Sequence, residues 1–345
     1  MPIDVARAQG WRPPAEWRRV SVIDAHAAGE PLRIVLAGVD PIPGDTIVAK
    51  RTWARENLDE LRRGLMFEPR GHADMYGAVV TEPVRPDGDL GVLFMHNEGW
   101  STMCGHGIIA LVTVAIETHM LVSRDVVRID TPAGRVTARP KREGGHVASV
   151  AFENVPSFVL DLDGTVAVPS LGTIRYDLAF GGAFYAYVDV AQVGLEIDAK
   201  DYRGLIDAGW RIKRAVMTQR SIPHPFESEL SFLYGTIFTG PAREPGARAR
   251  NVCVFADGEV DRSPTGTGVS GRVAIEHARG RLAIGAPFVV ESIIGTRFVG
   301  RVARETTFGP HRAVVPEVEG SAWINGRGEL WFDPRDPLRG GFILR

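Results

Sequence analysis

Two short glycine-rich segments hold the residues whose types and spacing could do acid–base chemistry. The first is Met103-Cys104-Gly105-His106-Gly107, and the second is Ser263-Pro264-Thr265-Gly266-Thr267-Gly268. Each leads into a helical run, so the first backbone amides of each helix should point at an anion in front of it. Because one segment carries a thiol where the other carries a hydroxyl, the pair predicts an asymmetric acid–base site.

Cys104 is predicted to be the functional one of the two cysteines. The dipole of a helix favours thiolate over thiol at the helix N-terminus. Gly105 and Gly107 would keep the approach open to a ligand, and His106 could hydrogen-bond to the thiolate or to a reacting group. A buried structural cysteine is the alternative. Cys253, in the apolar run 251–255, is expected only to pack.

The second segment predicts a cradle for a small carboxylate. Asp261 and Ser263 could cap the helix and Pro264 suits its first turn, while Gly266 and Gly268 permit close backbone approach to a ligand. The segment lacks the lysine of a phosphate-binding P-loop and the glycine spacing of a dinucleotide site. Asp261 could instead bind a cationic amine, and both roles remain open.

Three weaker features stand elsewhere in the chain. The polar segment 69–77, with His72 and Asp74, is either a loop that lines the site or an ordinary turn. His26 and Glu30 are interpreted as parts of a hairpin turn. Cys104-x-His106 and His72-x-Asp74 could supply metal ligands, but no paired Cys or His-x₃-His spacing supports them, so no metal is expected.

The composition excludes several classes of protein. The 345 residues are 44% apolar and 24% charged with a net charge of −2, which is ordinary for a globular protein and gives no basic surface for nucleic acid. No apolar run of about 18 residues predicts a membrane span, and the N-terminus lacks the apolar stretch of a signal peptide. Two cysteines favour a reduced, cytoplasmic protein. The length favours two domains.

The elements that must position these residues are mostly strands. Alternating or apolar runs separated by Gly, Pro and Asp predict strands at 20–24, 32–39, 77–81, 91–95, 126–129 and 147–152. Helical patterns cover 57–64, 107–120, 192–209 and 269–279. The helix at 107–120 is apolar nearly all round, which predicts burial inside a wrap of strands.

A weak internal repeat indicates two related domains. Gly134 stands 30 residues after Cys104, and Gly295 stands 30 residues after Thr265. We therefore predict a domain at 1–165 and another at 166–345, each a strand layer around one buried helix, with both helix N-termini at a cleft between them. The extreme C-terminal segment is expected to pack back on the first domain.

These residues resemble the proline racemase family, which shares the diaminopimelate epimerase fold. The two long motifs carry the resemblance, and shorter matches support it along most of the chain at His26-x₂-Gly29-Glu30-Pro31-x-Arg33, Pro41-x-Pro43-Gly44, Arg70-Gly71-His72-x-Asp74-Met75 and Asn154-Val155-Pro156-Ser157-Phe158. The resemblance implies an α+β fold of two pseudo-symmetric domains with the site between them. It also implies a small amino-acid substrate, no cofactor and a homodimer.

One departure from the family changes the expected reaction. Its racemases carry cysteine at both catalytic positions, whereas Thr265 makes this sequence similar to the subgroup that dehydrates trans-3-hydroxy-L-proline. A threonine hydroxyl is far too weak an acid to replace a thiol near neutral pH. With Cys104 as the single base, loss of the Cα proton and of water would give Δ1-pyrroline-2-carboxylate. A proline or hydroxyproline racemase, and a non-catalytic amino-acid-binding protein, are the alternatives.

The resemblance also implies roles for the site residues. Cys104 would be the general base, Thr265 would contact the substrate without taking a proton, Asp261 would bind the ring nitrogen and His106 would partner the thiolate or the leaving hydroxyl. The substrate carboxylate, and the charge that develops on it, would accept hydrogen bonds from the amides of Gly105, His106, Gly266 and Thr267. The proton donor to the leaving hydroxyl stays open between His106, Cys104 and water.

Overall fold

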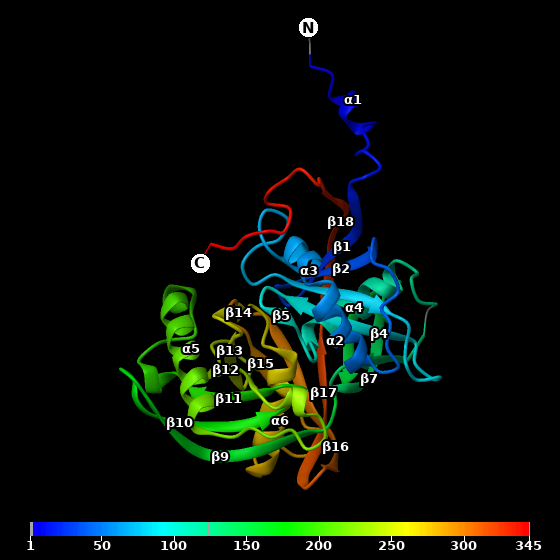
Figure 1. Cartoon of the computed structure of the whole chain (residues 1–345). Coiled ribbons are helices and arrows are strands. Elements are labelled where there is room, and N and C mark those ends of the chain that lie inside the picture. The colour runs from blue at the N-terminus through cyan, green and yellow to red at the C-terminus, as the bar shows by residue number, and fades with distance from the viewer. Residues whose placement is uncertain (1–2, 123, 345) are drawn as a thin grey trace.

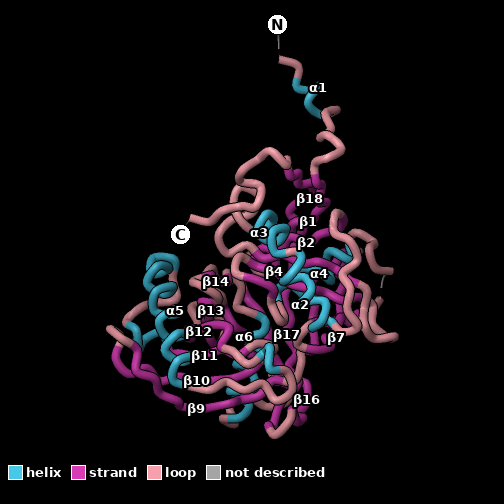
Figure 2. The backbone as a smooth tube through the Cα atoms, in the orientation of Figure 1, coloured by secondary structure: helices cyan, strands magenta, loops and turns pink. Residues whose placement is uncertain are grey.

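Strands dominate the structure, a computed structural model that describes residues 3–122 and 124–344 (Figures 1 and 2). The first half holds β1 (Arg18–Ala27), β2 (Glu30–Ala37), β3 (Tyr76–Thr81), β4 (Leu90–His96), β5 (Gly99–Trp100), α4 (Gly105–Glu117), β6 (Val127–Thr131), β7 (Gly134–Glu143) and β8 (His146–Glu153). The second half holds β9 (Ser157–Val168), β10 (Gly172–Phe180), β11 (Phe184–Asp189), β12 (Leu233–Gly240), β13 (Ala249–Phe255), β14 (Glu259–Asp261), α6 (Gly266–Ala278), β15 (Phe288–Glu291), β16 (Arg297–Phe308) and β17 (His311–Gly320). Every strand expected from the sequence lies over one of these.

The strand pairings repeat from one half to the other. In the first half β1–β2 is antiparallel, β2–β3 parallel, β3–β4 antiparallel and β4–β6 parallel. In the second half β10–β11, β11–β12, β12–β13 and β13–β15 follow the same order of directions. Gly134 and Gly295, the glycines of the sequence repeat, both have positive φ next to the equivalent hairpins β6–β7 and β15–β16. The pseudo-symmetric α+β architecture is therefore confirmed.

One helix lies inside each half. Every residue of α4 from Gly105 to Ile116 is buried, as its apolar sequence predicted. Both helices begin earlier than expected, α4 at Gly105 rather than Gly107 and α6 at Gly266 rather than Val269. Glycine is a poor helix former, so the sequence pattern did not indicate that the first turns of α4 and α6 are helical. The close approach of the two helices requires glycine here, because a Cβ on Gly105 would lie 2.5 Å from the Cα of Gly266.

The chain returns to the first half at its C-terminal end. β18 (Ala322–Phe332) pairs antiparallel with the whole of β1, and Figure 1 shows the two strands side by side above the second half. The C-terminal strand therefore lies against the first strand of the chain. β8 pairs with β17, which joins the halves into one continuous sheet. The boundary expected at residue 165 falls inside β9 and stays a prediction.

The surface helices differ most from expectation. The sequence predicted one helix at 57–64, whereas α2 (Ile47–Asn57) and α3 (Asp59–Met66) occupy this region. The expected helix at 192–209 is a short 3₁₀ turn followed, after the left-handed Gly194, by α5 (Tyr202–Gln219). The short α1 (Val5–Gln9) stands away from the body (Figure 1). Over the described residues, no helix combines the length and apolarity that crossing a membrane requires.

Candidate active site

A cavity lies where the N-termini of α4 and α6 meet, and both halves line it. The first half contributes Glu30, Tyr76, Met103, Cys104, Gly105 and His106. The second half contributes Tyr185, Tyr234, Cys253, Phe255, Asp261, Thr265, Gly266 and Thr267. All the site residues predicted from the sequence are in these two sets. The structure therefore brings the two glycine-rich motifs together, while their individual roles stay predictions.

Cys104 is the N-cap residue of α4. Its Sγ accepts a hydrogen bond from the Gly107 amide at 3.2 Å and lies 3.3 Å from Nδ1 of His106. Burial raises the pKa of the thiol well above its usual range. The Gly107 amide lowers this pKa, and the charges of Asp261 and Glu30 raise it further. The expectation that the helix N-terminus makes a thiolate is wrong for this state, because burial outweighs one amide hydrogen bond.

His106 is an uncharged imidazole. Burial lowers its pKa to about 3, although a hydrogen bond with the backbone of Pro31 opposes the shift. The ring packs edge-on against the Tyr76 ring, with 4.9 Å between centroids. At neutral pH the side chain can therefore orient the thiol of Cys104, but it carries no spare proton for a leaving group.

Thr265 occupies the N-cap position of α6 in a strained conformation. Its φ is 67°, which is costly for a β-branched residue and is typical of functional positions. The hydroxyl makes no hydrogen bond of good geometry, yet it lies near enough to Asp261 and Cys253 to lower the pKa of both. A buried hydroxyl in this state is available to a ligand.

The helix caps expected in this segment are not present. The Asp261 carboxylate accepts from the Ser263 amide at 2.7 Å, and the Ser263 hydroxyl accepts from the Thr265 amide at 3.1 Å. These bonds build the turn before α6 and do not cap it, and Pro264 lies outside the helix rather than in its first turn. The helix-capping role considered for Asp261 is therefore wrong, and contact with a ligand stays a prediction.

The glycines of both motifs allow close packing where the two helices begin. Gly105 and Gly266 contact each other, as described above. A Cβ on Gly107 would lie 2.5 Å from the Phe94 ring, and one on Gly268 would lie 2.4 Å from Ile237. Gly105 and Gly266 also line the cavity, and the expectation that they let a ligand approach stays a prediction. Their function is to let the two helix N-termini converge on one cavity.

Glu30 is a site residue that sequence reasoning missed. It was interpreted as part of a turn, but it is 0% exposed and lines the cavity from the start of β2. Its Oε2 accepts from the Arg262 amide at 2.8 Å, and its Oε1 has no hydrogen-bond partner among the described residues. Burial raises the Glu30 pKa well above its usual range, and the nearby Asp261 adds to the shift. Burial also raises the pKa of Asp261, to about 6.

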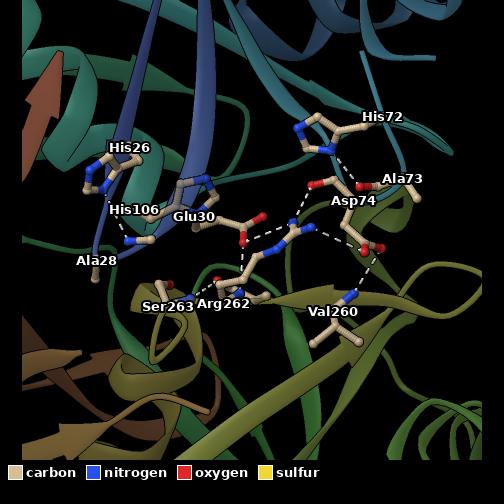
Figure 3. Close-up of polar contacts among 12 residues, drawn as sticks. His26, Ala28, Glu30, His72, Ala73, Asp74, His106, Val260, Arg262 and Ser263 are labelled. Carbon is tan, nitrogen blue, oxygen red and sulfur yellow. Dashed lines mark hydrogen bonds and ion pairs between the residues drawn. The ribbon is translucent and has the colours of Figure 1, made fainter. Parts of the chain in front are cut away.

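Arg262 connects the two halves behind the cavity (Figure 3). Its guanidinium lies 3.5 Å from carboxylate oxygens of both Glu30 and Asp74, and Asp74 also accepts from the Val260 amide at 3.2 Å. Asp74 thus supports the site without lining the cavity. His72 is exposed and lies outside it, as does His26, which stacks on Trp323.

Strands supply further residues of the cavity, and three of them bear on its chemistry. Tyr76, Tyr234 and Cys253 lie in β3, β12 and β13. Cys253 was expected to pack, and it lies fully buried in the hydrophobic core. Nothing in the sequence indicated that it also forms part of the cavity wall beside Thr265. Only Tyr76, at the end of the polar segment 69–77, had a signal in the sequence. No group of three or more His, Cys, Asp or Glu side chains within 3–122 and 124–344 is arranged to hold a metal.

Comparisons with known proteins agree with this geometry. The chain is 51% identical over 331 residues to trans-3-hydroxy-L-proline dehydratase of Azospirillum brasilense, covering 95% of this chain and 99% of that protein. It is 50% identical over 331 residues to 3-hydroxyproline 2-epimerase of Burkholderia multivorans, with the same coverage. The crystal structure of a hydroxyproline epimerase from Agrobacterium vitis with bound trans-4-OH-L-proline superposes with a TM-score of 0.90 at 34% identity, covering 96% of both chains.

The family assignment rests on nearly the whole chain. A model of the family described as proline racemase matches residues 22–343, from within β1 to beyond β18. The matched range contains both helix N-termini and every residue that lines the cavity. The chain belongs to the proline racemase family.

Proposed function

We propose that this protein dehydrates trans-3-hydroxy-L-proline to Δ1-pyrroline-2-carboxylate, with Cys104 as the base. The relatives carry the names of both dehydratases and epimerases, at 51% and 50% identity, so identity alone does not choose between the reactions. The observation that carries the proposal is the pairing of Cys104 with Thr265 across one buried cavity. A site with one thiol at the two helix N-termini can remove a proton, but Thr265 cannot return one to the other face.

Binding would use the charges already present in the cavity. The first amides of α4 and α6, from Gly105, His106, Gly266 and Thr267, have no acceptor within their helices and would hold the substrate carboxylate. The ring ammonium has two N–H groups, and Asp261 and the unpartnered Oε1 of Glu30 are the carboxyl acceptors in reach of the same cavity. The amides would also stabilise the negative charge that builds on the carboxylate as Cα loses its proton.

Binding of the substrate ammonium would convert the Cys104 thiol into the thiolate that acts as the base. Burial raises the pKa of Cys104, and the charges of Asp261 and Glu30 raise it further. A cation placed between these carboxyls compensates their charge and itself favours the thiolate, so the pKa of the thiol falls when substrate binds. The thiolate then removes the Cα proton, the C3–O bond breaks, and the resulting enamine tautomerises to the cyclic imine.

Epimerisation is the second candidate, and one observation favours it. Cys253 lines the cavity on the side of Thr265 and lies near the threonine hydroxyl. It could supply a second thiol, through Thr265, to the face opposite Cys104. Its pKa is raised well above the usual range by burial, which keeps it a proton donor. A Cys253→Ala variant separates the cases, because epimerase activity would fall and dehydration would persist.

The proposal is tested by the product. Purified protein is incubated with trans-3-hydroxy-L-proline and, in parallel, with the 4-hydroxy isomers, and Δ1-pyrroline-2-carboxylate is identified as proline by mass spectrometry after borohydride reduction. We expect product from the 3-hydroxy substrate and none with the Cys104→Ser variant, whose hydroxyl is too weakly acidic to ionise. Turnover by that variant would contradict the role of Cys104. A wild-type protein that forms only the epimer would contradict the dehydratase assignment.

The remaining expectations are part of the same proposal. We infer a cofactor-independent enzyme that acts on a small amino acid, works as a homodimer in the cytoplasm and has no nucleic-acid or membrane partner. The net charge of −2 and the two unpaired cysteines support these inferences. Analytical ultracentrifugation measures the oligomeric state, and activity after treatment with a chelator tests independence of metal.

A further inference from the structure

Two tyrosine hydroxyls meet in the cavity beside the thiol of Cys104. Tyr76, from the first half, and Tyr234, from the second half, are 4% and 8% exposed, and their Oη atoms are 2.9 Å apart. The Ser101 hydroxyl lies 3.5 Å from Oη of Tyr234 and also donates to the carbonyl of Met103 at 3.1 Å. These hydroxyls form a chain that crosses from one half of the molecule to the other. The steps described so far do not use it.

We propose that Tyr76 is the general acid that protonates the leaving 3-hydroxyl and that Tyr234 positions it, an assignment that rests on the proposed dehydration. Loss of water from an unactivated carbon needs such an acid because hydroxide is a strong base and leaves poorly. Tyr76 would touch the substrate hydroxyl and is therefore a catalytic residue. Tyr234 acts through Tyr76 and is a positioning residue.

The stereochemistry of the substrate fixes the side from which this proton must come. In trans-3-hydroxy-L-proline the hydroxyl and the carboxylate lie on opposite faces of the ring. The Cα hydrogen also lies opposite the carboxylate, so the hydrogen and the hydroxyl share one face. A base that removes this hydrogen and an acid that protonates this hydroxyl must therefore stand together. Cys104 takes the hydrogen, so the acid must be a neighbour of Cys104.

Tyr76 meets that requirement, whereas Thr265 and His106 do not. Its hydroxyl is close enough to Cys104 for a hydrogen bond that lowers the pKa of the thiol. Thr265 begins the other helix and is too weak an acid. His106 is uncharged, since its pKa is about 3. Burial raises the pKa of Tyr76 well above its usual range, so the phenol stays protonated until the leaving oxygen develops charge.

The step balances without any further reagent. The Cα–H bond breaks as its proton moves to the Cys104 thiolate, and its electron pair forms the C2–C3 double bond. The C3–O bond breaks with its electron pair on oxygen, which takes the phenolic proton of Tyr76 and leaves as water. The new thiol of Cys104 then returns its proton to the Tyr76 phenolate. Both groups are thereby reset in the forms that began the cycle.

The test compares two leaving groups in matched variants. Wild type, Tyr76→Phe, Tyr234→Phe and the control Tyr187→Phe are each assayed with trans-3-hydroxy-L-proline and with trans-3-fluoro-L-proline. Both substrates need the same Cα deprotonation, but fluoride leaves without a proton transfer to oxygen. The Tyr187 hydroxyl donates to the Gly268 carbonyl at 2.8 Å and does not line the cavity. It therefore reports the effect of removing a buried phenol near the site.

We expect kcat/KM of Tyr76→Phe for the hydroxyl substrate to fall about 10²–10⁴-fold, which is the rate acceleration that a general acid usually supplies. For the fluoro substrate we expect kcat/KM to fall less than about tenfold. Tyr234→Phe should show a smaller loss with the same dependence on leaving group, and Tyr187→Phe should leave the ratio of the two substrates unchanged. If Tyr76→Phe fails to fold and loses both activities, the test rests on Tyr234→Phe, whose ratio of kcat/KM for the hydroxyl substrate to kcat/KM for the fluoro substrate is compared with that of wild type.

Two results would overturn the assignment. Unchanged dehydration by Tyr76→Phe would mean that Cys104 or water delivers the proton. Equal losses for both substrates in Tyr234→Phe and in a folded Tyr76→Phe would mean that the tyrosines act only on structure or on the thiol. Failure of the proposed function looks different, because wild type itself would then release no water from trans-3-hydroxy-L-proline.

Discussion

The uncharged state of His106 predicts a pH dependence of stability that one substitution removes. The folded pKa is about 3, against 6.5 for an unperturbed imidazole. A group with a lowered folded pKa contributes stability above the unfolded value and loses it as pH falls. Between pH 7 and pH 5 only the unfolded state takes up this proton. His106 should therefore destabilise the protein by about 2 kcal/mol over that interval.

Neighbouring groups with the opposite sign partly conceal this effect in wild type. Asp261 has its pKa raised from 3.8 to about 6, so its folded form takes up the proton first as pH falls. It should stabilise the protein by about 1.3 kcal/mol between pH 7 and pH 5. Glu30, whose pKa is also raised, acts in the same direction. Both carboxyls remain in a His106→Asn variant, so the difference between the two proteins isolates His106.

The measurement is urea-induced unfolding of wild type and His106→Asn, followed by fluorescence of the seven tryptophans at pH 7 and pH 5. We expect the variant to gain about 2 kcal/mol relative to wild type on acidification, whatever constant cost the substitution carries at both pH values. If the pH dependence of the two proteins agrees within about 0.5 kcal/mol, His106 titrates normally. The argument that it cannot protonate the leaving hydroxyl would then be wrong.

Three further predictions follow from the charges and geometry of the cavity. Glu30→Gln removes a carboxyl that raises the pKa of Cys104, so the limb of the kcat/KM profile on which activity rises with pH should move to lower pH, while KM rises. A rising limb that does not move would show that Glu30 does not act on the thiol. Thr265→Cys supplies a second thiol acid, so epimerase activity in a chiral assay of hydroxyproline should rise about 10²-fold or more over wild type. If the variant loses dehydration and forms no epimer, other residues determine which reaction occurs. cis-3-Hydroxy-L-proline, whose hydroxyl lies opposite its Cα hydrogen, should not be dehydrated, and product from it would contradict elimination on the face of Cys104.

The residues at the two helix N-termini could be predicted because their chemistry is local. Cys104 and Thr265 stand next to glycines at the start of apolar helical runs, and helix geometry alone aims the neighbouring amides. The 30-residue spacing to Gly134 and Gly295 revealed the two-fold repeat for a similar reason. Each glycine lies beside a hairpin that follows its helix at the same interval.

The rest of the cavity depends on how distant strands close around these helices. Glu30, Tyr76, Tyr234 and Cys253 come from four different strands, and nothing local shows which face of each strand meets the cavity. The protonation state of Cys104 was mispredicted for the same reason. Its pKa reflects burial against one amide hydrogen bond, and the degree of burial follows from tertiary packing.

The claim that this site works on one face of its substrate is tested most directly by incubation with L-proline in D₂O, under conditions that fully dehydrate trans-3-hydroxy-L-proline. L-Proline has no leaving group, so the only visible chemistry is removal and return of the Cα proton. The account predicts that any deuterium at Cα appears in L-proline, because Cys104 returns the proton to the face from which it came. Accumulation of D-proline would contradict it, since a second acid would then act from the side of Thr265.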